Sequence, residues 1–262
     1  MSDPITLATW NVEWATPTRH DAIRERIASW NADILVVTEG DHGVLPAGGQ
    51  AADAGADWGY RNTKPHWRKV ILWSRWPLRE VSTDVPAGVR TGRLVDAVVE
   101  APVEAPVGLI RVLAVCIPWR DAHVRTGIDP HGEQWREHTA MVAHIGRLVA
   151  AHDPGTPLVL LGDFNQRLPR VHQPRVVHEY LLQALGPLDV PTAGTDPLPG
   201  LDRQEVDHIA VSSHFTAGRV WGVDRHDGDH RLSDHDAVLA SVCLVESGRS
   251  PHESGPDYRK VG

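Results

Sequence analysis

A short apolar run in the second half of the chain restricts local structure more than any other stretch. Residues 158–165 read L-V-L-L-G-D-F-N, and Pro157 and Gly162 bound the apolar part. Such a run is typical of a short strand that is covered on both faces. Because alternate residues of an extended chain point to the same side, Asp163 and Asn165 are predicted to project together from the strand end. A simple Asp/Asn turn is the alternative, since both residue types favour turns.

Polar side chains follow other apolar runs in the same way. They form five groups at or just past predicted strand ends: Asn11 with Glu13, Glu39, Asp163 with Asn165, Asp207 with His208, and Ser233 with Asp234 and His235. One acidic residue in such a place usually caps a loop or is simply solvated. Five groups in one chain favour a common site at one edge of the fold, where the strand ends are held rigidly by the ladder behind them.

The order of the predicted elements indicates the fold class. We predict strands at 5–12, 34–38, 70–74, 94–100, 109–117, 158–162, 206–212 and 237–245, with an additional strand near 219–223. Helices are predicted at 20–31, 135–152 and 176–185, and loops at 43–59, 122–133 and 186–201. Many strands and few helices, without strict alternation, favour two packed sheets covered by helices. We expect one domain over residues 1–245 and a flexible tail over residues 246–262.

Charge and composition argue against several classes of protein. The 262 residues carry 26 basic and 34 acidic side chains, which disfavours a protein that coats duplex nucleic acid through a basic face. No apolar run is long enough to predict a membrane span, and residues 1–6 lack the pattern of a secretory signal. Cys116 and Cys243 lie in apolar runs and are predicted to be buried small hydrophobic residues. We therefore expect a cytoplasmic protein, and a monomer.

Five segments carry a resemblance to a known family. They are T-W-N-V-E-W at 9–14, D-I-L-V-V-T-E at 33–39, L-L-G-D-F-N at 160–165, E-V-D-H-I-A-V-S at 205–212 and L-S-D-H-D at 232–236. In this order, and over nearly the whole chain, they resemble the endonuclease/exonuclease/phosphatase superfamily of metal-dependent phosphoesterases. The resemblance implies a four-layer α/β/β/α sandwich, in which two mixed sheets pack face to face between outer helices and the active site lies at one edge.

The resemblance also implies a divalent metal site. Glu39 would be the principal ligand, with Asn11 and Glu13 close by. Asp234 would complete the set of ligands or hold water near the ion. All four side chains offer oxygen atoms, which suit Mg²⁺ or Mn²⁺ better than zinc.

The catalytic residues that the resemblance implies are Asp163, Asn165, Asp207 and His235. Asp163 would position and deprotonate the attacking water, and Asn165 would donate a hydrogen bond to the phosphate or the nucleophile. Asp207 would orient His235 and favour its protonated form, so that the ring contacts the phosphoryl oxygens. The implied reaction is in-line attack on phosphorus, with the metal and His235 neutralising charge on the oxygens.

The sequence departs from the family pattern in two places. Thr38 stands before the predicted metal ligand, where relatives usually carry Gln. Cys116 stands in the middle strand, where relatives carry Tyr or His, so a group that could contact phosphate is missing.

Substrate contacts are assigned to Trp119, Arg120 and His123 as a replacement for that missing group. Residues 67–69, which read W-R-K, are predicted to form a stacking and phosphate-binding rim together with Trp119 and Arg120. An ordinary surface loop is the alternative. The phosphoester substrate stays undecided between a small molecule and a nucleic acid, and a lipid headgroup also fits the charge balance.

Two other functions stay open. One is a DNA-repair or degradative nuclease of the same fold, with its basic surface confined to the site. The other is a catalytically silent binding module, whose signature would be the loss of Asp163, Asn165 or His235; all three are present. The run 224–236, which is rich in His and Asp, is interpreted as a solvated loop because it lacks the two-His helical spacing of a zinc site.

Overall fold

The computed structural model describes residues 3–60, 64–102, 108–124 and 131–245, which contain two mixed β-sheets. The six-stranded sheet, in the order β10-β13-β1-β2-β4-β3, consists of β1 (Ile5–Asn11), β2 (Ile34–Gly40), β3 (Gln50–Asp53), β4 (Arg68–Ser74), β10 (Phe215–Val223) and β13 (Ala237–Leu244). The five-stranded sheet, in sequence order, consists of β5 (Leu78–Ser82), β6 (Leu94–Glu100), β7 (Leu109–Cys116), β8 (Leu158–Asp163) and β9 (Asp207–Val211). The other elements are α1 (Pro17–Ser29), α2 (Arg136–Ala150), α3 (Arg175–Leu185), the 3₁₀ turn η1 (His42–Val44) and the small hairpin β11 (His226–Asp227) and β12 (His230–Arg231).

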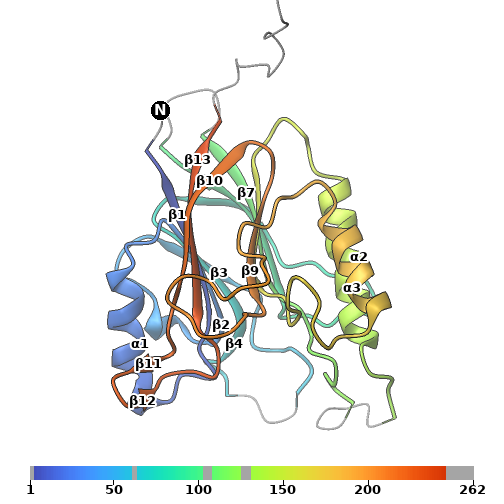
Figure 1. Ribbon diagram of the computed structural model, residues 1–262, viewed down its shortest axis with the longest axis horizontal. Helices are drawn as coiled ribbons and strands as arrows, with labels where there is room; N and C mark the ends of the chain where they lie inside the picture. Colours follow the sequence, from blue (N-terminus) through green and yellow to red (C-terminus); the bar gives the residue numbers. More distant parts are fainter. Residues whose placement is uncertain (1–2, 61–63, 103–107, 125–130, 246–262) are drawn as a thin grey trace, which may run out of the picture.

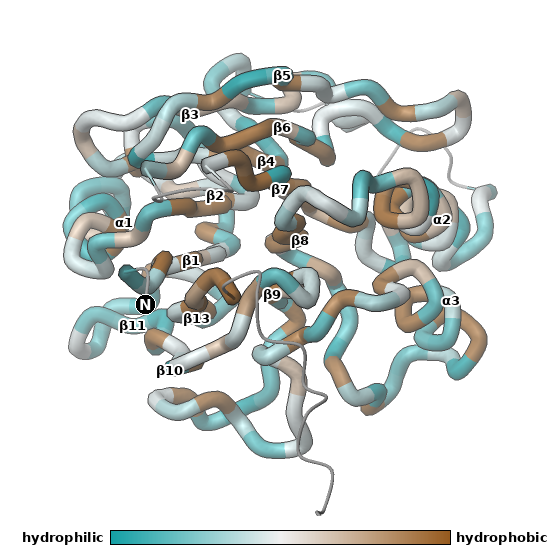
Figure 2. Tube along the Cα trace, turned by 90° about the horizontal axis from the view of Figure 1, so that it is seen from above, coloured by the Kyte–Doolittle hydropathy of each residue, from teal (hydrophilic) through white to brown (hydrophobic). Residues whose placement is uncertain are grey.

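These elements form four layers. Figure 1 shows them from left to right as α1, the six-stranded sheet, the five-stranded sheet, and α2 with α3. The view from above in Figure 2 shows the apolar stretches of β6, β7 and β8 in the interior of the molecule. The predicted α/β/β/α sandwich is confirmed.

The alternation of side chains along the strands explains why the sheets pack on both faces. In β1, Ile5 and Leu7 join the core between the two sheets, whereas Ala8 and Trp10 pack on the opposite face together with Ile27 of α1. The outer face of the five-stranded sheet is covered by the apolar sides of α2 and α3. The central strands of each sheet are therefore covered on both faces.

The prediction is wrong at the edges of the sheets. Residues 43–59 are predicted as a loop, yet Gln50–Asp53 form β3, and no strand is predicted at Leu78–Ser82, which form β5. Both are edge strands with mostly exposed or half-buried side chains, so neither contains the apolar run that a buried strand requires. β10 also begins at Phe215, before the predicted start near residue 219.

Three further predictions concern the start of α1, the burial of the two cysteines, and the extent of the domain. Helix α1 begins at Pro17 rather than residue 20, because Thr16 is its N-cap and proline fits the first turn of a helix. Cys116 is buried as predicted, but Cys243 is only half-buried, and both thiols are free. Residues 246–262 lie outside the described residues, and the single domain over 1–245 stays a prediction.

None of the helices in the described part of the chain is both long enough and apolar enough to cross a bilayer.

Candidate active site

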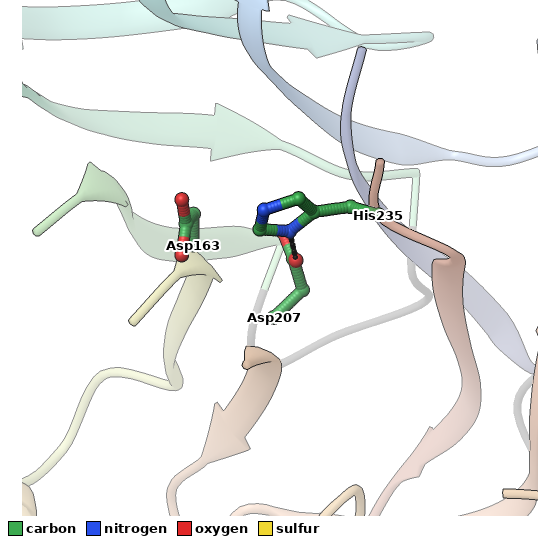
Figure 3. A group of neighbouring side chains, drawn as sticks. All are labelled: Asp163, Asp207 and His235. Atoms are coloured by element: carbon green, nitrogen blue, oxygen red, sulfur yellow. Dashed lines mark hydrogen bonds and ion pairs between the residues drawn. The ribbon is translucent and has the colours of Figure 1, made fainter. Parts of the chain in front are cut away.

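The ends of strands from both sheets meet at one edge of the sandwich. β1 ends at Asn11 and β8 ends at Asp163. β9 runs antiparallel to β8 and begins at Asp207, directly opposite Asp163. β13 runs antiparallel to β1, which brings His235, just before its start, to the same edge. Figure 3 shows Asp163, Asp207 and His235 pointing toward one another from three separate segments.

The Asp163 carboxylate is held by amide groups. Its Oδ1 accepts the backbone N–H of Asn165 at 2.8 Å, and its Oδ2 accepts the side-chain amides of Asn165 at 2.9 Å and Asn11 at 3.2 Å. The Asn165 amide also donates to the Ile117 carbonyl oxygen at 2.8 Å, so both of its N–H bonds are used within the protein. The predicted donation from Asn165 to phosphate therefore needs correction, because this amide orients Asp163.

Gly162 places the acidic end of β8 close to β7. A Cβ atom at this position would lie 1.9 Å from the backbone oxygen of Val115, and the backbone φ is +139°. Only glycine adopts this conformation without strain. The glycine of the G-D-F-N motif thus has a structural cause, which is the close approach of the two strands.

His235 forms a short hydrogen bond that fixes the plane of its ring. Its Nδ1 donates to Asp207 Oδ2 at 2.5 Å, and its backbone N–H donates to Ser233 Oγ at 3.1 Å. Its Nε2 makes no hydrogen bond to the described residues, and Asp234 Oδ1 lies 4.0 Å from it. In Figure 3 this nitrogen is on the side of Asp163, so its N–H is available to a substrate.

Burial and neighbouring charges shift the pKa values of this cluster. Burial and the nearby Asp207 carboxylate raise the pKa of Asp163 to about 7, although His235 acts in the opposite direction. Burial alone would lower the pKa of His235, but Asp207, and then Asp163 and Asp234, raise it to about 10. At neutral pH His235 is protonated, whereas Asp163 exchanges between its two forms.

A lysine binds the carboxylate that the resemblance assigns as the principal metal ligand. Lys69 Nζ donates to Glu39 Oε1 and lies 4.7 Å from the ring centroid of Trp14. Trp14 in turn packs on Trp58 and Trp67, with ring centroids 5.2 Å and 4.9 Å away. Burial would raise the pKa of Glu39, but Lys69 outweighs this effect and holds the pKa below its usual value. Glu39 is therefore ionised, and Lys69 is part of the site rather than of an outer rim.

Arg93 lies at the same edge, and the sequence reasoning misses it. This residue directly precedes β6, is 1% exposed and donates from Nη1 to the Cys116 carbonyl oxygen at 3.3 Å. Cys116 stands at the end of β7, opposite Asp163. Burial raises the pKa of the Cys116 thiol to about 12, so the thiol is neutral. The one signal for Arg93 in the sequence is its place immediately before a predicted strand.

Glu13 does not join the acidic cluster. Its Oε2 accepts Arg19 Nη1 at 3.1 Å, and its Oε1 accepts Arg231 Nη2 at 3.0 Å. Two arginines therefore neutralise this carboxylate, and the prediction that it lies at the metal is corrected.

His123 does not reach the site either. Its ring is fully buried, with Nδ1 2.6 Å from Glu137 Oε2 and Nε2 3.0 Å from the Trp58 carbonyl oxygen. Because both nitrogens are occupied within the protein, the assignment of His123 to substrate is corrected. Trp119 and Arg120 follow β7 and are exposed, so their assignment to substrate stays a prediction.

The oxygen atoms at this edge fit a hard divalent cation. One ligand atom from each of Asp163, Asp207 and His235 lies within 4.8 Å of the others. Asp207 Oδ1 is buried and has no hydrogen-bond partner among the described residues, so an acceptor is left over. Asn11 and Glu39 add two further oxygen donors. Carboxylate and amide oxygens, which dominate this set, are the ligands that hard divalent cations take.

The chain belongs to the Endonuclease/Exonuclease/phosphatase family, whose sequence pattern it matches over residues 8–235. This family includes hydrolases of phosphoester bonds, which typically depend on a divalent metal. No protein with a curated description matches the sequence.

Solved structures at low sequence identity share the fold. The catalytic domain of human Nocturnin with a bound sulfate anion is 17% identical, over 93% of this chain and 94% of that one, with a TM-score of 0.65. An AP endonuclease from Archaeoglobus fulgidus is 16% identical, over 90% and 98%, with a TM-score of 0.65. The 3' phosphatase NExo from Neisseria, bound to a product DNA hairpin, is 21% identical, over 90% and 98%, with a TM-score of 0.63.

Proposed function

We propose that this chain is a divalent-metal-dependent phosphoesterase that hydrolyses a phosphodiester or phosphomonoester by in-line attack of water on phosphorus. The observation that carries the proposal is the convergence of Asp163, Asp207 and His235 at one edge of the sandwich (Figure 3). A base, a protonated imidazole and oxygen ligands for a cation are the groups that such a hydrolysis needs.

Asp163 is proposed to accept the proton of the attacking water. A pKa of about 7 leaves much of this carboxylate ionised at neutral pH and still basic enough to take a proton. The amides of Asn11 and Asn165 hold its oxygens in a fixed orientation. Orientation of the base matters because proton abstraction requires hydrogen-bond contact with the water.

His235 is proposed to bind a phosphoryl oxygen through its free Nε2–H. Its pKa of about 10 keeps the ring cationic, so the ring offsets the negative charge of the phosphate. Asp207 holds the ring in place and stabilises its charge through the Nδ1 hydrogen bond.

Asn11, Glu39 and Asp234 are proposed to hold the cation, Mg²⁺ or Mn²⁺. When bound, the cation would neutralise charge on the phosphoryl oxygens. Because Lys69 already contacts Glu39, the cation and this ammonium compete for, or share, one carboxylate.

A nuclease of the same fold is the second candidate. The names of two structural neighbours, an AP endonuclease and a 3' phosphatase bound to a product DNA hairpin, favour it. A catalytically silent binding module has less support, since the carboxylates and the histidine of the cluster are all present and converge.

A substrate panel tests the proposal. Bis-(p-nitrophenyl) phosphate, p-nitrophenyl phosphate, plasmid DNA and an abasic oligonucleotide are each incubated with Mg²⁺, with Mn²⁺ and with EDTA. The Asp163→Asn variant is compared with Asp21→Asn, which removes an exposed carboxylate from α1. We expect hydrolysis that requires the metal, a loss on the order of 10³-fold in Asp163→Asn, and no loss in Asp21→Asn.

The outcomes separate the candidates. Cleavage of plasmid or abasic DNA alone selects the nuclease. Turnover that persists in EDTA, or near-normal turnover in Asp163→Asn, contradicts the proposed mechanism.

A further inference from the structure

Arg93 is a buried cation with hydrogen-bond donors left over. Its Nη1 donates to the Cys116 carbonyl oxygen and lies 3.9 Å from the Cys116 sulfur. Its Nε and Nη2 are buried and have no hydrogen-bond partner within the described ranges. A buried guanidinium without an anionic partner is energetically unfavourable, because the lost hydration is not replaced. Such a residue is therefore expected to have a partner that the chain itself does not provide.

The strand register places Arg93 in line with the residues of neighbouring strands that form the site. The backbone N–H of Cys116 donates to the Arg93 carbonyl oxygen at 3.0 Å, so the two residues lie side by side. Cys116 pairs with Asp163, and Asp163 pairs with Asp207. Residues directly opposite one another in a sheet have their side chains on the same face. The Arg93 guanidinium contacts Cys116, the residue of β7 that lies opposite Asp163.

The charges of the site leave this cation without a counter-ion. Lys69 contacts Glu39, and His235 contacts Asp207. Asp163 is held by the side-chain amides of Asn11 and Asn165. Arg93 contacts a carbonyl oxygen and a neutral thiol and no carboxylate among the described residues. Among the described residues, Arg93 is therefore a cation of the site that contacts no carboxylate.

We propose that Arg93 binds a terminal phosphate group and that the substrate is a phosphomonoester. The free Nε and Nη2 edge of a guanidinium forms a fork that matches two oxygens of one phosphate. A phosphomonoester carries between one and a half and two negative charges at neutral pH, and a diester carries one. The monoester has one more unesterified oxygen and more negative charge than the diester, which suits the unused Nε and Nη2 donors of Arg93. This inference rests on the proposed phosphoesterase function and specifies its substrate class.

Binding of inorganic phosphate in EDTA tests the subsite without turnover. Isothermal titration calorimetry is carried out on the wild type, Arg93→Met, Arg93→Lys and Arg79→Met. Arg79 is a matched control, because it is an exposed arginine of the same sheet that pairs with Glu100. We expect phosphate affinity to fall at least about 10-fold in Arg93→Met, to fall several-fold in Arg93→Lys, and to stay unchanged in Arg79→Met.

Turnover with Mn²⁺ then tests the substrate class. We expect Arg93→Met to lower kcat/KM for p-nitrophenyl phosphate at least about 10-fold more than for bis-(p-nitrophenyl) phosphate. Circular dichroism and thermal unfolding establish whether the variants fold. If Arg93→Met does not fold, the same comparison is made with Arg93→Lys.

Three results would overturn the inference. They are the absence of phosphate binding to the wild type, equal phosphate affinity in the wild type and the Arg93 variants, and an equal loss of turnover on both esters. If the wild type binds phosphate through Arg93 but hydrolyses no ester, the phosphate subsite stands, whereas the proposed function and the substrate class fail.

Discussion

Two histidine–carboxylate pairs in the described part of the chain have nearly the same distance from Nδ1 to the carboxylate oxygen. His235 Nδ1 lies 2.5 Å from Asp207, and His123 Nδ1 lies 2.6 Å from Glu137. The first pair joins the start of β9 to the segment before β13, and the second joins the segment after β7 to α2. In both, a carboxylate fixes the tautomer and the orientation of the ring.

The second nitrogen of each ring makes the difference. His123 Nε2 is 3.0 Å from the Trp58 carbonyl oxygen, and the ring has no exposed surface. His235 Nε2 has no hydrogen-bond partner among the described residues, and 16% of the side chain is exposed, next to Asp163. A histidine whose two ring nitrogens both have partners within the protein holds segments of the chain together. A histidine with one free N–H can also contact a ligand. The pair alone does not distinguish a structural from a functional histidine.

The largest expected effect is on turnover. His235→Gln is expected to lower kcat on the order of 10³-fold, because it removes the cationic donor to the phosphoryl group. His123→Gln is expected to change kcat less than about threefold, since it removes a contact remote from phosphorus. Steady-state kinetics on the best ester of the panel measure both. Similar losses in the two variants would end the distinction.

The second effect is on stability, where the His123 variant is expected to lose more than the His235 variant. His123→Gln is expected to lower the free energy of unfolding by about 2 kcal/mol, because the buried Glu137 carboxylate loses its 2.6 Å contact and keeps, among the described residues, only Arg90, at 3.4 Å. His235→Gln is expected to lower it less. Urea unfolding measures these values. His42→Gln is the control, because His42 forms a similar 2.6 Å contact with Asp53 at the surface and is expected to contribute little.

The third effect concerns the carboxylates. Asp207→Asn is expected to lower kcat on the order of 10²-fold, because the ring loses the group that orients and charges it. Without Asp207 the pKa of His235 falls, so the alkaline limb of the pH–rate profile moves to lower pH. Glu137→Gln is expected to leave the profile in place. An unmoved alkaline limb in Asp207→Asn would show that this limb does not report His235.

The smallest effect is the pH dependence of stability. The pKa of His235 is raised from 6.5 to about 10, so the folded protein binds this proton more tightly than the unfolded chain. The resulting stabilisation is complete below pH 6.5 and is lost as the pH rises toward 10. We expect the free energy of unfolding to fall over this window, and to fall less in His235→Gln. Equal slopes would contradict this.

The strand ends of the site could be predicted because apolar runs bound them. The apolar runs of β1, β2 and β8 end in the sequence at polar residues, which are Asn11, Glu39 and Asp163. The edge strands β3 and β5 could not be predicted in this way. Their side chains are exposed or half-buried, so their sequences contain no run of apolar residues.

The remaining site residues depend on contacts that no local pattern records. Arg93 becomes part of the site only through the pairing of β6 with β7. Lys69 meets Glu39 because the antiparallel register of β2 and β4 places them opposite. His123 is assigned wrongly from the sequence for the same reason, since its partner Glu137 lies on α2, 14 residues further along the chain.

The hydrogen bond from Asn11 to Asp163 runs from one sheet to the other. The spacing between the two halves of the site is therefore set by the thickness of the apolar layer that separates the sheets. A change of side-chain volume in that layer, as far away as Leu72 or Val112, alters this spacing while every polar group is retained. We therefore expect the rate of the proposed reaction to depend on the volume of this apolar layer as well as on the polar groups of the site.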